Sequence, residues 1–129
     1  MNARGRVLLA DDEVHVLRVL DLKFRTAGYD CVLVHDGLEA WDRVHRVRPH
    51  LVISDYQMPG LNGLDLAERM FQDKELRHVP IILLTGRGMS LRPRDLALTN
   101  IVHLVSKPFS PKSLLAMAQD MLAGSLCGG

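Results

Sequence analysis

Short apolar runs alternate along this chain with longer stretches in which apolar residues recur at helical spacing. The runs are rich in Val, Ile and Leu, which predicts strands that are buried on both faces of a sheet. They lie at residues 6–11, 29–34, 50–54, 79–85 and 101–106. Pro80 falls in the first residues of the fourth run, where a missing N–H is tolerated.

The stretches between these runs carry signals for the start and end of helices. Asp12 is a candidate N-cap for a first helix that ends at Gly28. Asp36, with Glu39 three residues later, resembles a capping box, and the second helix stops before Pro49. The first half of the chain therefore predicts two amphipathic helices, each of which follows a strand.

The second half of the chain predicts three more helices. One is expected at about residues 64–72. The segment 86–100 contains two glycines and a proline, which predicts a loop followed by a short helix at about 94–99. The last helix is expected to begin with Ser110 as its N-cap and to end at Gly124.

Five strands that alternate with five helices predict an α/β fold, in which a parallel sheet lies between two layers of helices. A length of 129 residues suits one domain. We expect that domain to have a core over about residues 5–123 and a flexible tail over 124–129.

Composition and charge narrow the possible classes of function. The net charge of +1 gives no strong attraction to nucleic acid or to a membrane surface, so we expect neither as a direct partner. No apolar run approaches the roughly 20 residues that span a bilayer. The two cysteines have no metal-ligand spacing, which predicts neither a zinc site nor a disulfide and fits a reducing, cytoplasmic location.

The candidate chemistry lies where the predicted strands end. Ligands of parallel α/β sheets bind beyond the carboxyl ends of the strands, and there the chain places Asp11, Asp12, Asp55, Thr85 and Lys107. Three carboxylates repel one another, and a hard divalent cation such as Mg²⁺ relieves that repulsion. A lysine ammonium and a threonine hydroxyl can both bind a phosphoryl oxygen. These residue types predict phosphoryl chemistry with Asp55 as the nucleophile.

Four sequence motifs then identify a family resemblance. The stretches LLADDE, VISDYQMPGLNG, IILLTG and SKPF resemble the receiver domain of two-component response regulators, and the resemblance covers about residues 5–123. It implies a single receiver domain with the flavodoxin-like (βα)5 three-layer sandwich of the chemotaxis regulators, with strand order 2-1-3-4-5. It also implies that Asp55 accepts a phosphoryl group from a phosphohistidine of a sensor histidine kinase or phosphotransfer protein. Such a domain is not a conventional enzyme, although the resemblance implies that it catalyses its own phosphorylation, with dephosphorylation as a further candidate activity.

The same resemblance implies roles for the other residues of the site. Asp12 matches a direct ligand of Mg²⁺, or of another divalent cation such as Mn²⁺, and Asp11 matches an acid that holds the ion largely through water. Asp55 and the backbone carbonyl of Gln57 complete the implied metal ligands. Thr85 matches the hydroxyl that turns toward the phosphoryl group. Lys107 matches the lysine beside that group, and its bond to Pro108 is implied to be cis.

The chain also departs from the family pattern. Leu104 stands where the family usually has an aromatic residue, and Pro93 falls where the fourth helix should run. Thr99 and Asn100 replace a common Gly-Ala pair. These positions belong to the face that most members use for output or dimerisation. We therefore expect phosphorylation that controls an output partner or downstream domain, with a homodimer as a further option, but without the usual coupling through this face.

Two other functions remain open from the sequence. A binding module that signals without phosphate is suggested by the altered stretch 87–104, although a complete acidic site argues against it. A phosphohydrolase with an aspartyl nucleophile would need a second acid close after Asp55, where this chain has Gln57.

Overall fold

The computed structural model describes residues 4–86 and 89–127, with side chains up to Ala123. Five parallel strands form one sheet in the order β2-β1-β3-β4-β5. The strands are β1 (Arg6–Ala10), β2 (Asp30–Val34), β3 (Leu51–Asp55), β4 (Ile81–Thr85) and β5 (Ile101–Ser106). The predicted flavodoxin-like α/β fold and its strand order are confirmed.

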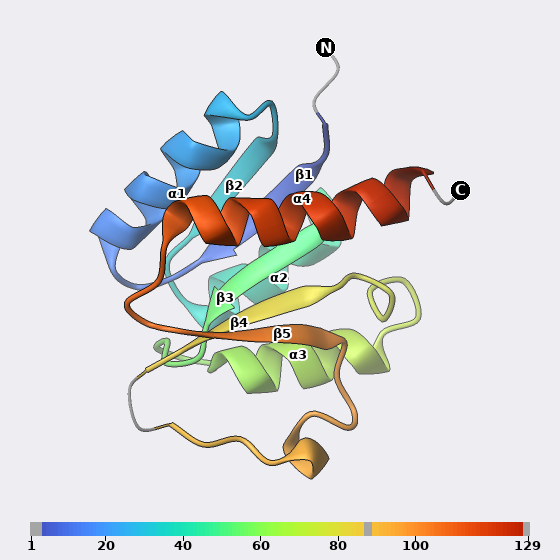
Figure 1. The fold of residues 1–129 in the computed structure, drawn as a ribbon. Helices are drawn as coiled ribbons and strands as arrows, with labels where there is room; N and C mark the ends of the chain where they lie inside the picture. Colours follow the sequence, from blue (N-terminus) through green and yellow to red (C-terminus); the bar gives the residue numbers. More distant parts are fainter. Residues whose placement is uncertain (1–3, 87–88, 128–129) are drawn as a thin grey trace.

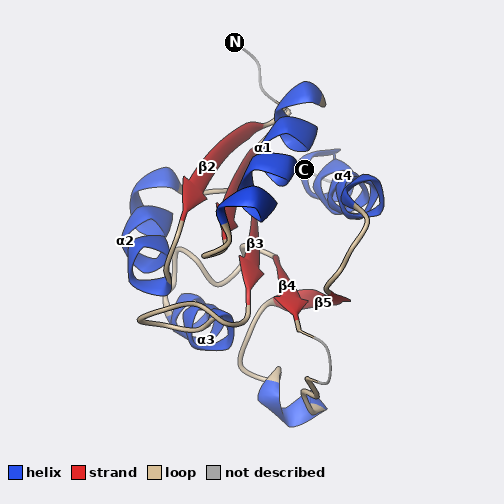
Figure 2. Ribbon diagram, turned by 90° about the vertical axis from the view of Figure 1, so that its left-hand side faces the viewer, coloured by secondary structure: helices blue, strands red, loops and turns tan. Residues whose placement is uncertain are grey.

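Two pairs of helices cover the two faces of the sheet (Figures 1 and 2). The helices are α1 (Val14–Thr26), α2 (Gly37–Val47), α3 (Gly63–Gln72) and the C-terminal α4 (Pro111–Cys127). Helices α1 and α4 pack on one face through a core that includes Leu17, Phe24 and Leu114. Helices α2 and α3 pack on the other face through a second core that includes Val44 and Met70.

The first helix begins one residue later than predicted. Its N-cap is Glu13, which makes no capping hydrogen bond with its side chain, and Asp12 is an exposed loop residue. The prediction that Asp12 caps this helix is therefore wrong. The physical reason lies in Asp11, whose Oδ1 accepts the Glu13 N–H at 2.9 Å and thereby satisfies a donor at the helix start.

The start of the second helix agrees with its predicted cap. Oδ1 of Asp36 accepts the Glu39 N–H at 2.7 Å. The Glu39 side chain reaches back, but Oε1 accepts the N–H of His35 at 2.9 Å instead of that of the cap residue. The Glu39 side chain therefore bonds the residue before the N-cap, and the reciprocal bond of a capping box, to the N-cap itself, is replaced.

The predicted helix at 94–99 is wrong. Only a 3₁₀ turn, η1 (Pro93–Asp95), forms in this region, so the described residues contain four α-helices instead of the five that were predicted. Asp95 Oδ2 accepts the N–H of Arg92 at 2.8 Å, which closes the turn at its start. Leu96 is the C-cap of η1, and the hydroxyl of Thr99 donates to the Leu96 carbonyl at 2.8 Å, which takes up a backbone acceptor after the turn.

The absence of a helix here leaves the edge of the sheet uncovered. In Figures 1 and 2, β5 lies at the edge of the sheet and the segment that carries η1 hangs away from it. Val102 and Leu104 on β5 are 49% and 43% exposed. By contrast, Leu83 on the neighbouring strand is fully buried.

The C-terminal helix begins as predicted and ends later. Ser110 Oγ accepts the N–H of Ser113 at 3.2 Å, as expected of an N-cap. The helix passes through Gly124 and reaches Cys127, so the predicted end at Gly124 is wrong. A glycine inside a helix lowers the stability of the helix by only about 1 kcal/mol relative to alanine, and the flanking turns can offset this loss. Of the predicted tail, residues 128–129 lie outside the described residues. None of the described helices is long and apolar enough to cross a membrane.

Candidate functional site

Three carboxylates meet at the carboxyl edge of the sheet. Asp11 and Asp12 follow β1, and Asp55 ends β3, which is the neighbour of β1 in the sheet. One oxygen from each side chain lies within 4.8 Å of the others. Asp11 and Asp55 are buried, with 1% and 6% of their surface exposed, whereas Asp12 is open to solvent.

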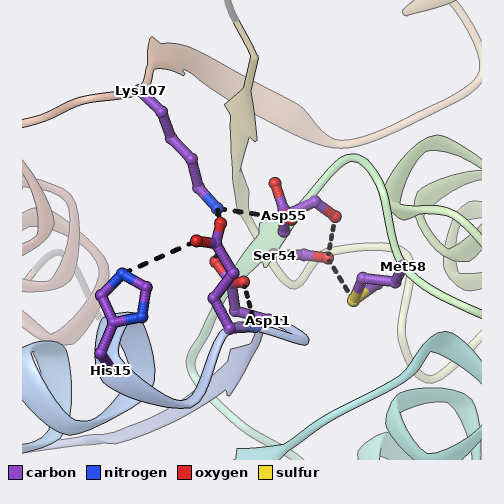
Figure 3. A network of polar contacts seen from close by, with 7 residues as sticks. Asp11, His15, Ser54, Asp55, Met58 and Lys107 are labelled. Atoms are coloured by element: carbon purple, nitrogen blue, oxygen red, sulfur yellow. Dashed lines mark hydrogen bonds and ion pairs between the residues drawn. The ribbon is translucent and has the colours of Figure 1, made fainter.

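Lys107 brings a positive charge to these carboxylates from the far edge of the sheet. Its Nζ lies 3.0 Å from Asp11 Oδ2 and 3.4 Å from Asp55 Oδ2 (Figure 3). The backbone N–H of Lys107 donates to the carbonyl of Thr85 at 2.8 Å. This bond connects Lys107, which follows β5, with Thr85, which ends β4. The Lys107–Pro108 peptide bond is cis, as the family resemblance implies.

The turn after Asp55 depends on the absence of a side chain at Gly63. A Cβ atom at Gly63 would lie 2.4 Å from the Asp55 carbonyl oxygen, closer than real Cβ atoms approach. The N–H of Gly63 donates to the carbonyl of Tyr56 at 2.8 Å, which closes the loop on itself. Gly60, with a φ of 82°, lies in the left-handed region that glycine tolerates.

An open pocket of about 380 Å³ adjoins the carboxylates on the side of this loop. Asp12 and Gln57 both contribute to its lining. The pocket is lined by Asp12, Tyr56, Gln57, Met58, Pro59 and Asn62. Gln57 is exposed and follows Asp55 by two residues, so it borders the same opening as the exposed carboxylate of Asp12.

The charges in the site shift one another's proton affinities. Burial, and next the negative charge of Asp11, raise the pKa of Asp55 to about 6, while Lys107 acts in the opposite direction. Burial alone would lower the pKa of Lys107, but its hydrogen bond to Glu13 and the negative charges of Asp11 and Asp55 raise it above its ordinary value. The lysine therefore remains an ammonium group among the carboxylates.

Glu13 is a site residue that the sequence reasoning missed. Its Oε1 accepts a hydrogen bond from Lys107 Nζ at 2.8 Å, and this bond with Lys107 lowers the pKa of Glu13. The available signal was its position directly after the acidic pair. Glu13 does not end a strand, where the other site residues lie, but is the cap residue of α1.

The donor set fits a hard divalent cation. Oδ2 of Asp11 is buried and has no hydrogen-bond partner among the described residues, although the Lys107 ammonium is an ion-pair distance away. Carboxylate oxygens that are close together and incompletely satisfied are the ligands that Mg²⁺ and Ca²⁺ use in proteins. The side chains that could hold such an ion are those of Asp11, Asp12 and Asp55.

Comparison with known proteins agrees with this arrangement. Residues 7–119 match the family model of the response regulator receiver domain. The chain belongs to this family. Receiver domains are signalling modules of two-component systems and not conventional enzymes, and the resemblance seen in the four sequence motifs is confirmed.

The relatives with curated names are longer proteins that contain a receiver domain. The DNA-binding response regulator MtrA of Mycobacterium tuberculosis H37Rv is 32% identical over 122 residues, covering 92% of this chain and 51% of MtrA. The phosphate regulon regulator PhoB of Pseudomonas aeruginosa is 28% identical over 116 residues, covering 90% of this chain and 51% of PhoB. This receiver chain thus spans about half the length of the curated relatives it matches.

Solved receiver structures share the fold along nearly the whole chain. A putative response regulator from Chloroflexus aurantiacus has a TM-score of 0.83 at 28% identity, covering 92% of this chain and 98% of its own. The receiver domain of the sensor histidine kinase PA1611 from Pseudomonas aeruginosa has a TM-score of 0.81 at 25% identity, with the same coverage. That domain was solved with a magnesium ion coordinated in its active-site cleft.

The predicted site residues are brought together to different degrees. Asp11, Asp12, Asp55 and Lys107 form one cluster of side chains. Thr85 ends the strand between them and is buried, and its main chain is bonded to Lys107. The metal ligands and the roles of these residues in the receiver domain remain predictions, which are taken up as a proposal below.

Proposed function

We propose that this receiver domain is phosphorylated on Asp55 by a phosphohistidine of a sensor histidine kinase or phosphotransfer protein. One observation carries the proposal. The ammonium group of Lys107 lies 3.4 Å from Oδ2 of Asp55, within a cluster of three carboxylates. A buried acid that is paired with a lysine, in a carboxylate cluster whose member Asp12 lines an open pocket, is suited to accept an anionic group and hold it.

The chemical step is a phosphoryl transfer between two side chains. A carboxylate oxygen of Asp55 attacks the phosphorus, and a new P–O bond forms while the P–N bond to the donor imidazole breaks. The electron pair of the P–N bond stays on the imidazole nitrogen, which can take a proton from water. The product is an acyl phosphate on Asp55.

The surrounding residues supply charge and position. Lys107 would pair with a phosphoryl oxygen, and the hydroxyl of Thr85 would donate a hydrogen bond to another. Gly86 follows Thr85, and an added Cβ there would meet nothing within 4 Å, so that side of the site has room.

The cation implied for the site is Mg²⁺, or another divalent ion such as Mn²⁺. The residues proposed to hold it are Asp11, Asp12, Asp55 and the backbone carbonyl of Gln57. When bound, the ion supplies positive charge that offsets the negative charge of the phosphoryl oxygens. The fit rests on the clustered carboxylates and on the unsatisfied Oδ2 of Asp11.

The mass of the intact protein tests the proposal directly. Incubation with Mg²⁺ and a small phosphodonor such as acetyl phosphate should add the mass of one phosphoryl group. A chelator of divalent ions should prevent the addition, and Asp55→Asn should abolish it. Equal uptake of phosphate by Asp55→Asn would show that another residue is the acceptor.

A second candidate is a module that binds a partner without phosphate. It is favoured by the 3₁₀ turn that replaces a helix beside β5, since the exposed Leu104 lies on this altered face. Hydrogen exchange over residues 89–106, with and without the phosphoryl mimic beryllofluoride, distinguishes the two. A phosphorylation switch changes the exchange there, whereas a phosphate-independent module leaves it unaltered.

The partners and the location belong to the same proposal. We expect a sensor kinase or phosphotransfer protein as the donor, in the cytoplasm, and an output partner or downstream domain as the target. Besides contact with an output partner or with a downstream domain, the β5 edge could also serve to form a homodimer. A phosphohydrolase is disfavoured, because receivers are signalling modules and exposed Gln57 stands where a second acid would be needed.

A further inference from the structure

We infer that Glu13 is a positioning residue that competes with Asp55 for the Lys107 ammonium in the unphosphorylated domain. The inference rests on the proposed function, because it concerns the lysine that would bind the phosphoryl group. Removing the Glu13 carboxylate is expected to release Lys107 toward Asp55 and to speed phosphorylation.

The distances around the Lys107 ammonium rank its three partners. Nζ lies 2.8 Å from Glu13 Oε1, 3.0 Å from Asp11 Oδ2 and 3.4 Å from Asp55 Oδ2. Of these contacts, the one with Glu13 has the geometry of a hydrogen bond. Asp55, the proposed acceptor, is thus the most distant of the three carboxylates that surround the lysine.

The exposure of the three carboxylates differs. The side chain of Glu13 is 47% exposed, whereas those of Asp11 and Asp55 are 1% and 9% exposed. The Lys107 ammonium has three N–H donors, so it can serve more than one of these carboxylates at once. A buried carboxylate gains more from the ammonium than an exposed one does, because water cannot replace the missing bond.

Only the side chains need to move for Lys107 to change partners. The main chain of Lys107 is fixed by its N–H, which donates to the Thr85 carbonyl at 2.8 Å. The main chain of Glu13 is fixed by its N–H, which donates to Asp11 Oδ1 at 2.9 Å. After the ammonium leaves, the Glu13 carboxylate can remain in water or approach His15, whose Nε2 is 3.6 Å from Oε2.

The partial exposure of Glu13 makes the bond easy to exchange. Exposed ion pairs contribute little to stability, since water screens them. A phosphoryl group on Asp55 brings about two negative charges close to Lys107 and would outcompete Glu13 for the ammonium. Glu13 therefore acts as a resting-state partner that competes with the phosphorylated product for one lysine.

Two substitutions separate the hydrogen bond from the charge of Glu13. Glu13→Gln keeps the length of the side chain and removes the charge, whereas Glu13→Asp keeps the charge and shortens the reach by one methylene. We expect both to raise the rate of phosphorylation by acetyl phosphate and Mg²⁺ about two- to fivefold, the factor for loss of a partly exposed ion pair. The rate is read from intact mass against time.

A matched control is available on α3. Glu68→Gln makes the same change in net charge, and Glu68 forms no ion pair within the described part of the chain. Its rate should equal that of the wild type. An equal increase for Glu68→Gln would assign the effect to net charge and overturn the inference, as would unchanged rates in both Glu13 variants.

The NMR signal of the Lys107 ammonium gives a second readout that does not depend on phosphorylation. It should shift in both Glu13 variants and stay unchanged in Glu68→Gln. If the wild type takes up no phosphate at all, the proposed function fails, and the ammonium signal alone still decides whether Glu13 holds Lys107. An unshifted signal in both Glu13 variants would overturn the inference in either case.

Discussion

Lys107 Nζ lies 3.4 Å from Asp55 Oδ2 although the two residues extend from strands that are not neighbours in the sheet. The lysine side chain crosses the end of β4 to reach the carboxylate at the end of β3. One ammonium therefore offsets negative charge from both Asp55 and Asp11, which are buried. Removing this ammonium group should therefore lower the stability of the fold as well as affect a reaction at Asp55.

Lys107→Met should lower the free energy of unfolding by about 2 kcal/mol at neutral pH. The reason is that the remaining carboxylates lose their partner, and the loss is smaller than for a fully buried pair because the lysine is partly exposed. Adding Mg²⁺ should recover part of the loss, since a cation held by the same carboxylates offsets their repulsion. Denaturant unfolding with and without Mg²⁺ measures both effects. Lys112→Met, at an exposed position on α4, is the control and should change neither quantity.

Gly37→Ala should destabilise the fold by about 3 kcal/mol or more, the upper range for overpacked sites. A Cβ atom at Gly37 would lie 1.8 Å from the carbonyl oxygen of Leu61, so the start of α2 would have to separate from the loop that follows Asp55. Gly86→Ala is the matched control, because its Cβ would meet nothing within 4 Å. Thermal unfolding of both variants tests this contact, and equal stability would contradict the close approach at Gly37.

The apolar face of β5 can be tested with two leucines that are partners across the sheet. Leu83 on β4 is fully buried, whereas its register partner Leu104 on β5 is 43% exposed. We expect Leu83→Ala to cost about 2–5 kcal/mol and Leu104→Ala less than about 1 kcal/mol. Denaturant unfolding gives both values. Comparable losses would mean that something covers Leu104 in solution.

The Cys31 thiol should resist modification in the folded protein. Burial is the main reason that the pKa of Cys31 rises from 9.0 to about 12, so the reactive thiolate is scarce at pH 8. In a Cys127→Ser background, a thiol reagent should react slowly with the native chain and rapidly after denaturation. Fast reaction of the native chain would contradict the burial of Cys31.

The same shift makes stability depend on pH at the alkaline end. The unfolded thiol loses its proton near pH 9, while the folded thiol keeps its proton up to about pH 12. The contribution of the neutral thiol is therefore complete below about pH 9 and falls as the pH rises toward 12. Cys31→Ala should remove this contribution, which is measured as the difference in unfolding free energy at pH 8 and pH 10.5.

The parallel sheet and the position of the acidic cluster could be predicted from local patterns in the sequence, whereas the strand order was implied by the family resemblance. The runs that end at Asp11 and Asp55 are apolar enough to be buried, and parallel strands bring their carboxyl ends to one edge. No knowledge of side-chain packing was needed for either result.

Features that depend on long-range packing could not be predicted in the same way. The hydrogen bond between Glu13 and Lys107 joins residues 94 positions apart, and the position of Glu13 after the acidic pair does not indicate which residue it contacts. The close approach at Gly37 likewise depends on where Leu61 lies. The helix expected at 94–99 failed for a local reason, since the side chain of Asp95 bonds the backbone at the start of η1 and that of Thr99 bonds the backbone after it.

Localisation of the phosphoryl group tests the central claim most directly. The wild-type chain is incubated with Mg²⁺ and acetyl phosphate, the acyl phosphate is trapped by reduction with borohydride, and the modified peptide is sequenced by mass spectrometry. We expect modification at Asp55 alone, with none when Mg²⁺ is chelated. Modification of Asp11, Asp12 or any other residue in place of Asp55, or uptake that is independent of the metal, would contradict the proposed role of this site.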